Sequence, residues 1–296
     1  MSAEPIAKSR DSKVDSYPTV RRMRFPFGEP EPIRRHFIEN DIVFSHLVAV
    51  LSGGFPPGEE SFIRSVRKFA DQITDPVLKK RIAGFIGQES VHGQEHRKLN
   101  VQLAALGFPL VRFLLFEPTS RRQKIYVRAE NLLPAKVHLA VTAAAEHLTA
   151  VLGARVLGKD EIQAIAGDPE VWNLLNWHAM EELEHKSVAF DVYRAVGGSE
   201  RTRIAVMRFI YYFIIPAMTV VVMVSMAMDP TAWRPITVAR QTFALFRGPL
   251  LRGLRAEMAE YMRPGFHPDD VHTDELLERW RQELFGANGE LVDYVK

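Results

Sequence analysis

The sequence predicts an all-α protein: a ferritin-like four-helix bundle with a dinuclear metal site and extra N- and C-terminal helices. Three observations predict this fold. Apolar residues recur at helical spacing from residue 31 onward, and strand signals are weak. A Glu-x-x-His motif occurs twice, as Glu89 to His92 and Glu182 to His185, at an offset of 93 residues. Four-helix bundles hold two metal ions with paired motifs of this kind, together with a lone Glu on each of two further helices.

The order of the helices follows from the periodicity and the turn residues. Helices are predicted over residues 31–51, 58–73, 76–103, 134–157, 160–166 and 169–196. Two of them start at Asp75-Pro76 and Asp168-Pro169, because Asp suits the N-cap and Pro the first helical position. Ser52-Gly53-Gly54, followed by Phe55-Pro56-Pro57, predicts a helix end and a turn. Residues 107–127 are expected to form the crossover between two helix pairs.

The predicted metal ligands come from four helices. Residues three apart share a helix face, so the Glu and His of each motif can reach one dinuclear centre. Glu59 lies 30 residues before Glu89, and Glu146 lies 36 before Glu182, so both midpoints fall near an Asp-Pro turn. Each helical hairpin would therefore bring a lone Glu level with a Glu-x-x-His. With His178, four residues before Glu182, the predicted ligands are Glu59, Glu89, His92, Glu146, His178, Glu182 and His185.

Other polar residues lie close to these ligands in the sequence. Glu95 and His96 are the predicted catalytic residues, as bases that face the substrate. For His96 the alternatives are a contact that orients a ligand and an ordinary hydrogen-bonded core histidine. His147 points about 100° away from its neighbour Glu146 on a helix and is expected to be structural. Without metal, the buried carboxylates would need other cations, such as Arg81 or Lys186 in buried salt bridges.

The composition limits the class of protein. The chain has 296 residues and a net charge of +2, so no nucleic-acid surface is expected. The absence of cysteine excludes disulfides, thiolate metal sites and a cysteine nucleophile. Ten histidines agree with a metal site of nitrogen and oxygen donors. There is no phosphate-binding glycine loop and no Gly-x-Ser-x-Gly elbow, which argues against a serine hydrolase.

The chain divides into three parts. Residues 1–19 are polar and are expected to be a disordered tail without a signal peptide, residues 20–200 form the metal-binding bundle, and residues 201–296 form an apolar and amphipathic helical extension. Within the extension, residues 209–228 hold no charge and are long enough to cross a bilayer, although Pro216 would kink such a helix. The alternative is a buried helix packed on the bundle. We expect a cytoplasmic protein, with association to the inner face of the membrane left open.

Short segments spread over roughly residues 20–270 resemble one bacterial family. They include Val20-Arg21-Arg22, Phe55-Pro56-Pro57-Gly58-Glu59, Asp75-Pro76, Phe85-Ile86-Gly87-Gln88-Glu89, and Tyr261-x-Arg263-Pro264-Gly265-Phe266-His267-Pro268. On these segments the chain resembles the predicted metal-dependent hydrolases. The ligand pattern alone is also similar to that of ferritin-like di-iron N-oxygenases of the p-aminobenzoate type, which carry a Glu, a Glu-x-x-His, a Glu and a His-x-x-x-Glu-x-x-His.

Three functions are consistent with these patterns. Four carboxylates and three imidazoles suit two iron ions, or manganese, and favour an oxygenase or oxidase of a small or hydrophobic organic substrate. The alternative is a hydrolase of an ester or amide, which would use a metal-bound hydroxide and zinc. Metal storage is the third. The expected partners are a small-molecule, lipid-like substrate and a redox protein, and a homodimer stays open.

Overall fold

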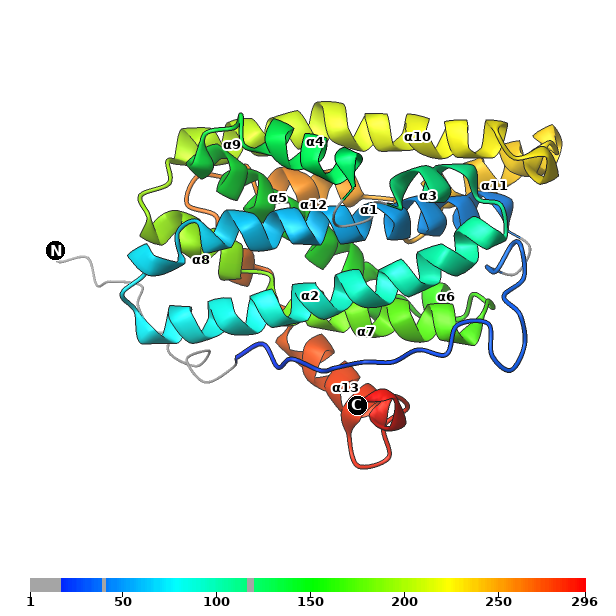
Figure 1. Ribbon diagram of the computed structural model, residues 1–296, viewed down its shortest axis with the longest axis horizontal. Helices are drawn as coiled ribbons and strands as arrows, with labels where there is room; N and C mark the ends of the chain where they lie inside the picture. The colour runs from blue at the N-terminus through cyan, green and yellow to red at the C-terminus, as the bar shows by residue number, and fades with distance from the viewer. Residues whose placement is uncertain (1–16, 39–40, 116–119) are drawn as a thin grey trace, which may run out of the picture.

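The computed structural model describes residues 17–38, 41–115 and 120–296, and it is all-α over these residues, as predicted. Four long helices form the centre (Figure 1): α1 (Ile42–Arg67), α2 (Pro76–Ala105), α5 (Ala135–Gly158) and α7 (Pro169–His185). α1 packs on α2 and α5 packs on α7, and contacts of α1 with α5 and of α2 with α7 join the two pairs. The ferritin-like relationship of this bundle stays a prediction. Most of the predicted tail, residues 1–16, lies outside the described residues.

Both predicted Asp-Pro helix starts are confirmed. An oxygen of Asp75 accepts a hydrogen bond from the backbone N–H of Val77 at 3.0 Å. Asp168 accepts from the backbone N–H groups of Glu170 and Val171. Between α2 and α5 the chain forms α3 (Pro109–Leu114) and α4 (Arg121–Glu130), and α6 (Asp160–Gln163) leads from α5 to α7. The predicted crossover therefore contains two short helices.

Several predicted helix boundaries are wrong. The helix predicted over residues 31–51 begins only at Ile42, where Asp41 caps it by accepting from the Phe44 backbone N–H, and residues 31–38 are not helical.

Two of the wrong boundaries bear on the site. The first helix was expected to end near Ser52, yet α1 continues through Pro56 and Pro57 to Arg67. A proline cannot donate to the carbonyl four residues before it, so Pro56 leaves the Ser52 carbonyl without its helical partner. The side-chain amide of Asn100 on α2 donates to that carbonyl at 2.8 Å. The neighbouring helix thus supplies the hydrogen bond that the proline removes.

The second wrong boundary lies at the end of α7. The predicted helix over residues 169–196 is interrupted at Lys186 and Ser187, and α8 (Val188–Ala195) follows. At the interruption the Lys186 ammonium donates to the Val271 carbonyl and to the Thr273 hydroxyl. α7 therefore ends directly after His185, and Lys186 connects this point to the segment around Val271 and Thr273 by hydrogen bonds.

An N-terminal strap, residues 17–38, runs along α2 and α7 without regular structure (Figure 1). Two glycines of α2 allow this close approach. A Cβ at Gly84 would overlap the Pro18 carbonyl, and a Cβ at Gly87 would overlap a Val20 methyl group. The strap is also tied to the C-terminus, because Met23 forms an isolated bridge with Val295. The strap is thereby held against the two helices that carry the Glu-x-x-His motifs.

The C-terminal part covers the other side of the bundle. α9 (Glu200–Phe209), the π-helical turn η3 (Ile210–Ile214) and α10 (Ile215–Ala227) form one continuous helix that lies lengthwise beside α1 and α5 (Figure 1). η4 (Pro230–Ala232), α11 (Pro235–Arg247) and α12 (Leu254–Glu260) follow. α13 (Asp274–Phe285) packs on α7 and α5. α13 is amphipathic, because it buries Leu277, Trp280 and Leu284 and exposes charged residues.

Two of the described helices are long and apolar enough to cross a membrane: Ala135–Gly158 and Glu200–Ala227. The core of the bundle explains the first, because 61% of its apolar window is buried. For the second the buried share is 22%. The alternative of a buried helix therefore does not describe Glu200–Ala227, which leaves most of its apolar surface exposed.

Candidate metal centre

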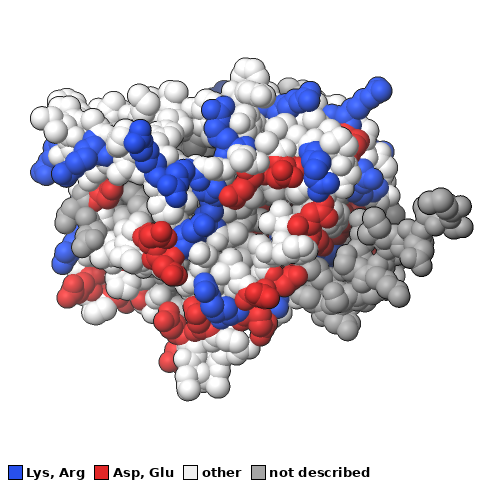
Figure 2. Space-filling model, turned by 180° about the vertical axis from the view of Figure 1, so that it is seen from behind, with Lys and Arg blue, Asp and Glu red and all other residues white. Residues whose placement is uncertain are grey.

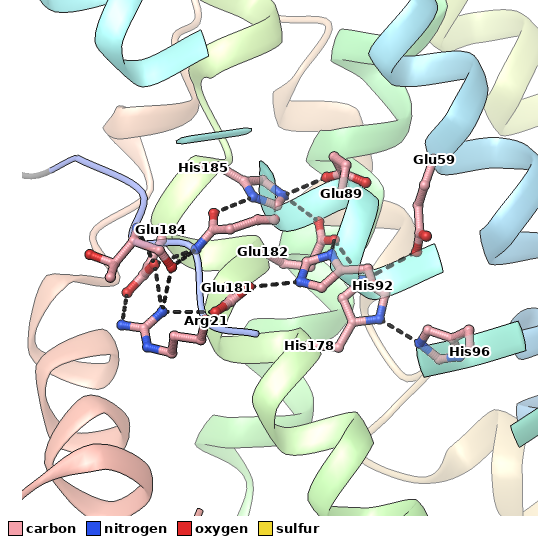
Figure 3. Close-up of polar contacts among 12 residues, drawn as sticks. Arg21, Glu59, Glu89, His92, His96, His178, Glu181, Glu182, Glu184 and His185 are labelled. Atoms are coloured by element: carbon pink, nitrogen blue, oxygen red, sulfur yellow. Dashed lines mark hydrogen bonds and ion pairs between the residues drawn. The ribbon is translucent and has the colours of Figure 1, made fainter. Parts of the chain in front are cut away.

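The structure brings all seven predicted ligands together in the middle of the bundle. Figure 3 labels these residues except Glu146. α1 contributes Glu59, α5 contributes Glu146, and the remaining residues come from α2 and α7. Their donor atoms form three groups, each lying within 4.8 Å: Glu59, His92 and His178; Glu89, Glu146 and His185; and Glu89, His92 and Glu182. Each of the seven residues is at most 4% exposed. The two Glu-x-x-His motifs and the two lone carboxylates therefore meet as the hairpin argument requires.

The cluster contains buried polar atoms that have no hydrogen-bond partner. Both carboxylate oxygens of Glu59, Glu89 and Glu146 are of this kind, as are His92 Nδ1 and His185 Nε2. His185 Nε2 lies 3.1 Å from a Glu89 oxygen and 3.2 Å from a Glu146 oxygen, but these contacts lack hydrogen-bond geometry. Buried carboxylates without partners are costly. Two divalent cations would balance the four carboxylate charges, so the residues present fit a dinuclear centre.

The pKa shifts describe the same electrostatic imbalance. Burial, and then the charge of Glu89, raises the pKa of Glu59 and of Glu146 well above the ordinary value. Burial alone would raise the pKa of Glu182 too, but the neighbouring His185 and His178 lower it well below its ordinary value. A cation between these carboxylates would favour their ionised forms. Metal binding and proton release are therefore coupled at this site.

The Glu181 carboxylate, on the side of His92 away from the cluster, determines which ring nitrogen of His92 carries the proton. His92 Nε2 lies 3.0 Å from an oxygen of Glu181, and the other oxygen of Glu181 accepts from Arg21 at 2.8 Å. When Glu181 is ionised, Nε2 must donate, so Nδ1 presents its lone pair toward Glu182, 3.9 Å away. Burial raises the pKa of Glu181 to about 8, against the effect of Arg21. A metal ion on Nδ1 would favour loss of that proton.

His185 is oriented by an amide whose own orientation is determined by its neighbours. The Gln88 amide nitrogen donates to Glu184 at 2.6 Å and to the Thr19 carbonyl at 3.1 Å. Its oxygen therefore faces His185 Nδ1, at 3.0 Å, and accepts from it. In the neutral imidazole the lone pair of His185 is then on Nε2, the atom that faces Glu89 and Glu146. Burial alone would lower the pKa of His185, but the charges of Glu182 and Glu146 raise it well above its ordinary value, so a metal ion bound there would displace a proton.

His178 ends a directed chain of hydrogen bonds. The Asn100 amide nitrogen donates to the Ser52 carbonyl, so its oxygen is the atom that accepts from the Ser52 hydroxyl at 2.7 Å. The Ser52 oxygen accepts in turn from His96 Nδ1 at 2.9 Å, and His96 Nε2 accepts from His178 Nδ1 at 2.7 Å. In the neutral form of His178 the lone pair is then on Nε2, 2.8 Å from Glu182; without a metal ion this short contact requires a proton between the two atoms, which a bound ion would replace. With Glu181 ionised and with His178 and His185 neutral, as metal binding would favour, each of the three histidines offers an unprotonated nitrogen to the cluster.

The structure places the two predicted catalytic residues, His96 and Glu95, away from the cavity beside the cluster, and their catalytic role stays a prediction. His96 is fully buried behind His178, which fits the orienting contact better than a base that faces the substrate. The Glu95 carboxylate accepts from the backbone N–H of Phe25 and pairs with Lys98, so it faces the N-terminal strap. His147, expected to be structural, packs against Tyr261 and Phe266. Neither predicted catalytic side chain lines the large cavity described next.

A cavity of about 820 Å³ adjoins the cluster. Thr149, His178 and Glu182 line its inner end, and the Thr149 hydroxyl donates to Glu182. Most of the wall is apolar and comes from α1, α5, α7, α10 and the segment after α11: Leu47, Leu51, Phe55, Leu152, Ile215, Met218 and Leu251. The cavity therefore connects an apolar space to two of the candidate ligands.

The sequence of the chain matches one known protein family over most of its length. The profile of a family described as predicted metal-dependent hydrolase matches residues 19–272. The chain belongs to this family. No curated protein and no solved structure matches it. Membership in this family supports a metal-dependent activity. The family description specifies hydrolysis as the reaction and specifies no metal.

Several site residues were missed by sequence reasoning. Glu181 and Glu184 are not among the predicted site residues, and Arg21 appears in the sequence analysis only within a segment shared with the predicted metal-dependent hydrolases. The structure buries both carboxylates, and Arg21 pairs with each of them (Figure 3). In the sequence, Arg21 and Gln88 could have been noticed because both lie inside segments shared with the family. Of the alternative cations, Arg81 pairs with Asp191, and Lys186 donates to the Val271 carbonyl and the Thr273 hydroxyl, so both are engaged outside the cluster.

Proposed function

We propose that the chain is a dinuclear metal enzyme that uses dioxygen to oxidise an apolar substrate. One observation carries the proposal: the carboxylate-rich cluster lies at the inner end of a large apolar cavity, with His178 and Glu182 in the wall of that cavity. Storage alone would not require such a cavity. An organic substrate in this space would lie beside the metal centre.

The donor set favours iron, with manganese second. Four carboxylates and three imidazoles are the oxygen and nitrogen donors that these ions take, and two ferrous ions would supply the activation of dioxygen. The protein residues would bind and orient the ions. Glu181 and Gln88 hold the imidazoles of His92 and His185 from behind. Phe55, whose ring centroid lies 4.7 Å from that of His178, would exclude water on the cavity side.

The apolar wall argues for oxidation over hydrolysis. Dioxygen is apolar and enters such a space readily, whereas hydrolysis consumes water and releases polar products. The polar side chains at the inner end of the cavity are Thr149, His178 and Glu182. Glu182 already accepts from Thr149, and His178 is held by His96. These contacts suit side chains that hold a metal ion.

Hydrolysis of an ester or amide is the second candidate, and the family description favours it over oxidation. In that reaction zinc would take the place of iron and supply the activation of water. Thr149 is the hydroxyl nearest to the cluster on the cavity side and is the candidate contact for the departing group. Both candidates need the same seven ligands.

Metal content tests the part that both candidates share. The wild-type protein should bind close to two ions per chain, and the Glu89→Ala, Glu182→Ala double variant should lose at least one of them. Glu60→Ala is the control, because Glu60 is next to Glu59 but pairs with Arg97 on the bundle surface. Full metal content in the double variant would contradict the dinuclear site.

The reaction class needs a separate experiment. After anaerobic loading with ferrous iron, addition of oxygen should give a transient visible absorption band within seconds. The zinc-loaded protein under argon, assayed on medium-chain esters, is the opposing test. Full turnover of an ester under argon, with no optical change on oxygenation of the iron form, would decide for the hydrolase.

A further inference from the structure

The continuous helix α9–η3–α10, together with α11 and the turn before it, exposes large apolar side chains to solvent. We call this surface the apolar face and define it by six side chains that are 57–86% exposed: Phe213, Val220, Met223, Trp233, Ile236 and Phe243. Soluble monomers rarely leave such a large contiguous apolar patch uncovered. The apolar face therefore needs a partner.

The charge around the apolar face indicates the kind of partner. Residues 201–256 contain eight arginines and one acidic residue, a net charge of +7, whereas the other 240 residues sum to −5. The single acid, Asp229, is buried and pairs with Arg35 and His46. In Figure 2 the upper edge of the molecule, where Figure 1 shows α10, is white and blue. Acidic residues border this stretch at Glu200 and Glu257, yet arginines predominate around the apolar face. An apolar surface with a mainly cationic rim is complementary to anionic lipid headgroups above a hydrocarbon layer.

The orientation of the helix argues for docking in the plane of a bilayer and against a span. α10 packs along α1, where Val222 and Met226 belong to one buried apolar cluster with Val43 and Val50, and α9 packs on α5. The helix could not cross a bilayer without taking the bundle and its charged surface into the hydrocarbon. One flank of the helix covers the bundle, so the opposite flank is the part available to lipid.

The cavity opens toward the same face. Ile214 and Phe246 both line the cavity and are 42% and 53% exposed. The π-helical turn η3 contributes Ile214 and Tyr211 to this wall, and Arg255 donates to the Tyr211 hydroxyl at 3.0 Å. π-helical turns inside α-helices are often found at functional sites. A molecule dissolved in the bilayer would thus have a short apolar path to Thr149 and the cluster.

We propose that the apolar face docks peripherally on an anionic lipid bilayer and that the substrate enters the cavity from that bilayer. The docking goes beyond the proposed function and does not depend on it, while the substrate path rests on the proposed function. The substrate class is a bilayer-resident acyl or other long-chain compound. Side chains of the apolar face insert among the acyl chains, and the exposed Arg208, Arg240, Arg247 and Arg252 contact the headgroups.

Vesicle binding by the full-length, metal-loaded chain tests the docking. Wild-type protein should sediment with vesicles of phosphatidylcholine and phosphatidylglycerol and only weakly with phosphatidylcholine alone. The Phe213→Ser, Ile236→Ser, Phe243→Ser variant should bind at least about tenfold more weakly, because inserted apolar area drives such binding. The control Val101→Ser, Val271→Ser, Val292→Ser removes exposed apolar side chains from other surfaces and should bind like wild type.

Charge reversal is the second arm. Arg240→Glu, Arg247→Glu should lower binding to anionic vesicles by about tenfold or more, since each basic residue near the surface contributes on the order of a fivefold factor. Lys79→Glu, Lys159→Glu, with the same charge change on exposed residues elsewhere, should have little effect. Equal binding of all four variants would overturn the docking. So would a detergent-sensitive dimer that does not bind vesicles, which would assign the apolar face to a second copy of the chain. Metal analysis of the same samples separates either failure from a failure of the metal site.

Discussion

Substitution of Gly93 by alanine separates the metal site from the stability of the bundle. Gly93 lies on α2, one residue after His92, and faces Glu59 across the α1–α2 contact. A Cβ built there would lie 2.9 Å from Glu59 Oε2 and 3.7 Å from the Pro56 Cα atom. Ordinary contact begins near 3.4 Å, so the carboxylate would have to move by about 0.5 Å. The side chain that moves is a predicted ligand, and the backbone next to it stays in place.

Two effects of this substitution have opposite signs. Alanine is the better helix former, which should raise the free energy of unfolding by about 0.5–1 kcal/mol. A ligand displaced by half an ångström should weaken binding of the nearer ion, and loss of a ligand-orienting contact typically costs about 10- to 100-fold in metal affinity. We therefore expect a metal-free protein that is at least as stable as wild type but binds the nearer ion at least about tenfold more weakly.

Chelator competition measures the affinity, and urea unfolding of the metal-free protein measures the stability. Gly54→Ala is the matched control, because a Cβ at Gly54 on α1 meets nothing within 4 Å. It should gain the same helix stability and keep both ions. If Gly93→Ala binds both ions as tightly as the control, then Glu59 is not a ligand, and the reasoning about the cluster fails at that residue.

Two further predictions follow from the histidines. His178→Ala should change the optical spectrum of the iron-loaded protein, whereas His147→Ala should leave it unchanged. The reverse result would show that His147, and not His178, lies on the side of the metal ions. Burial lowers the pKa of His147 from 6.5 to about 4. The unfolded chain therefore takes up this proton first, so stability is fully present above pH 6.5 and falls by up to about 3 kcal/mol as the pH drops to 4. Urea unfolding of His147→Phe should show a smaller loss between pH 7 and pH 4.5, and an unchanged loss would exclude His147 as its source.

The long-range arrangement was predictable because two signals repeat in the sequence. The Asp-Pro starts fix the beginnings of α2 and α7, and the distances from Glu59 to Glu89 and from Glu146 to Glu182 fix the height at which the hairpin partners meet. Helix phase then separates Glu59 from Glu60, which pairs with Arg97. These inferences need only local geometry and chain length.

What could not be predicted depends on partners that are distant in the sequence. The continuation of α1 through Pro56 depends on Asn100, and the orientation of His92 depends on Arg21 through Glu181. Local preference correctly disfavours a helix at two prolines, and nothing local shows that another helix provides the lost hydrogen bond. The apolar run at 209–228 likewise gave no indication that it would lie beside a cavity. Such contacts are set by packing between segments.

Asn100 makes two contacts with one residue, and this links the backbone of α1 to the proton position on a ligand. Its amide nitrogen bonds the Ser52 carbonyl that Pro56 leaves unpaired, and its oxygen bonds the Ser52 hydroxyl that begins the chain to His178. A transient opening of α1 at Pro56 would release both contacts together. The Ser52 hydroxyl could then rotate, His96 could exchange its proton between nitrogens, and His178 would present an N–H in place of its lone pair. Local opening of α1 at Pro56 and metal binding by His178 are therefore energetically coupled. Each opening of α1 would weaken the binding of the ion by His178.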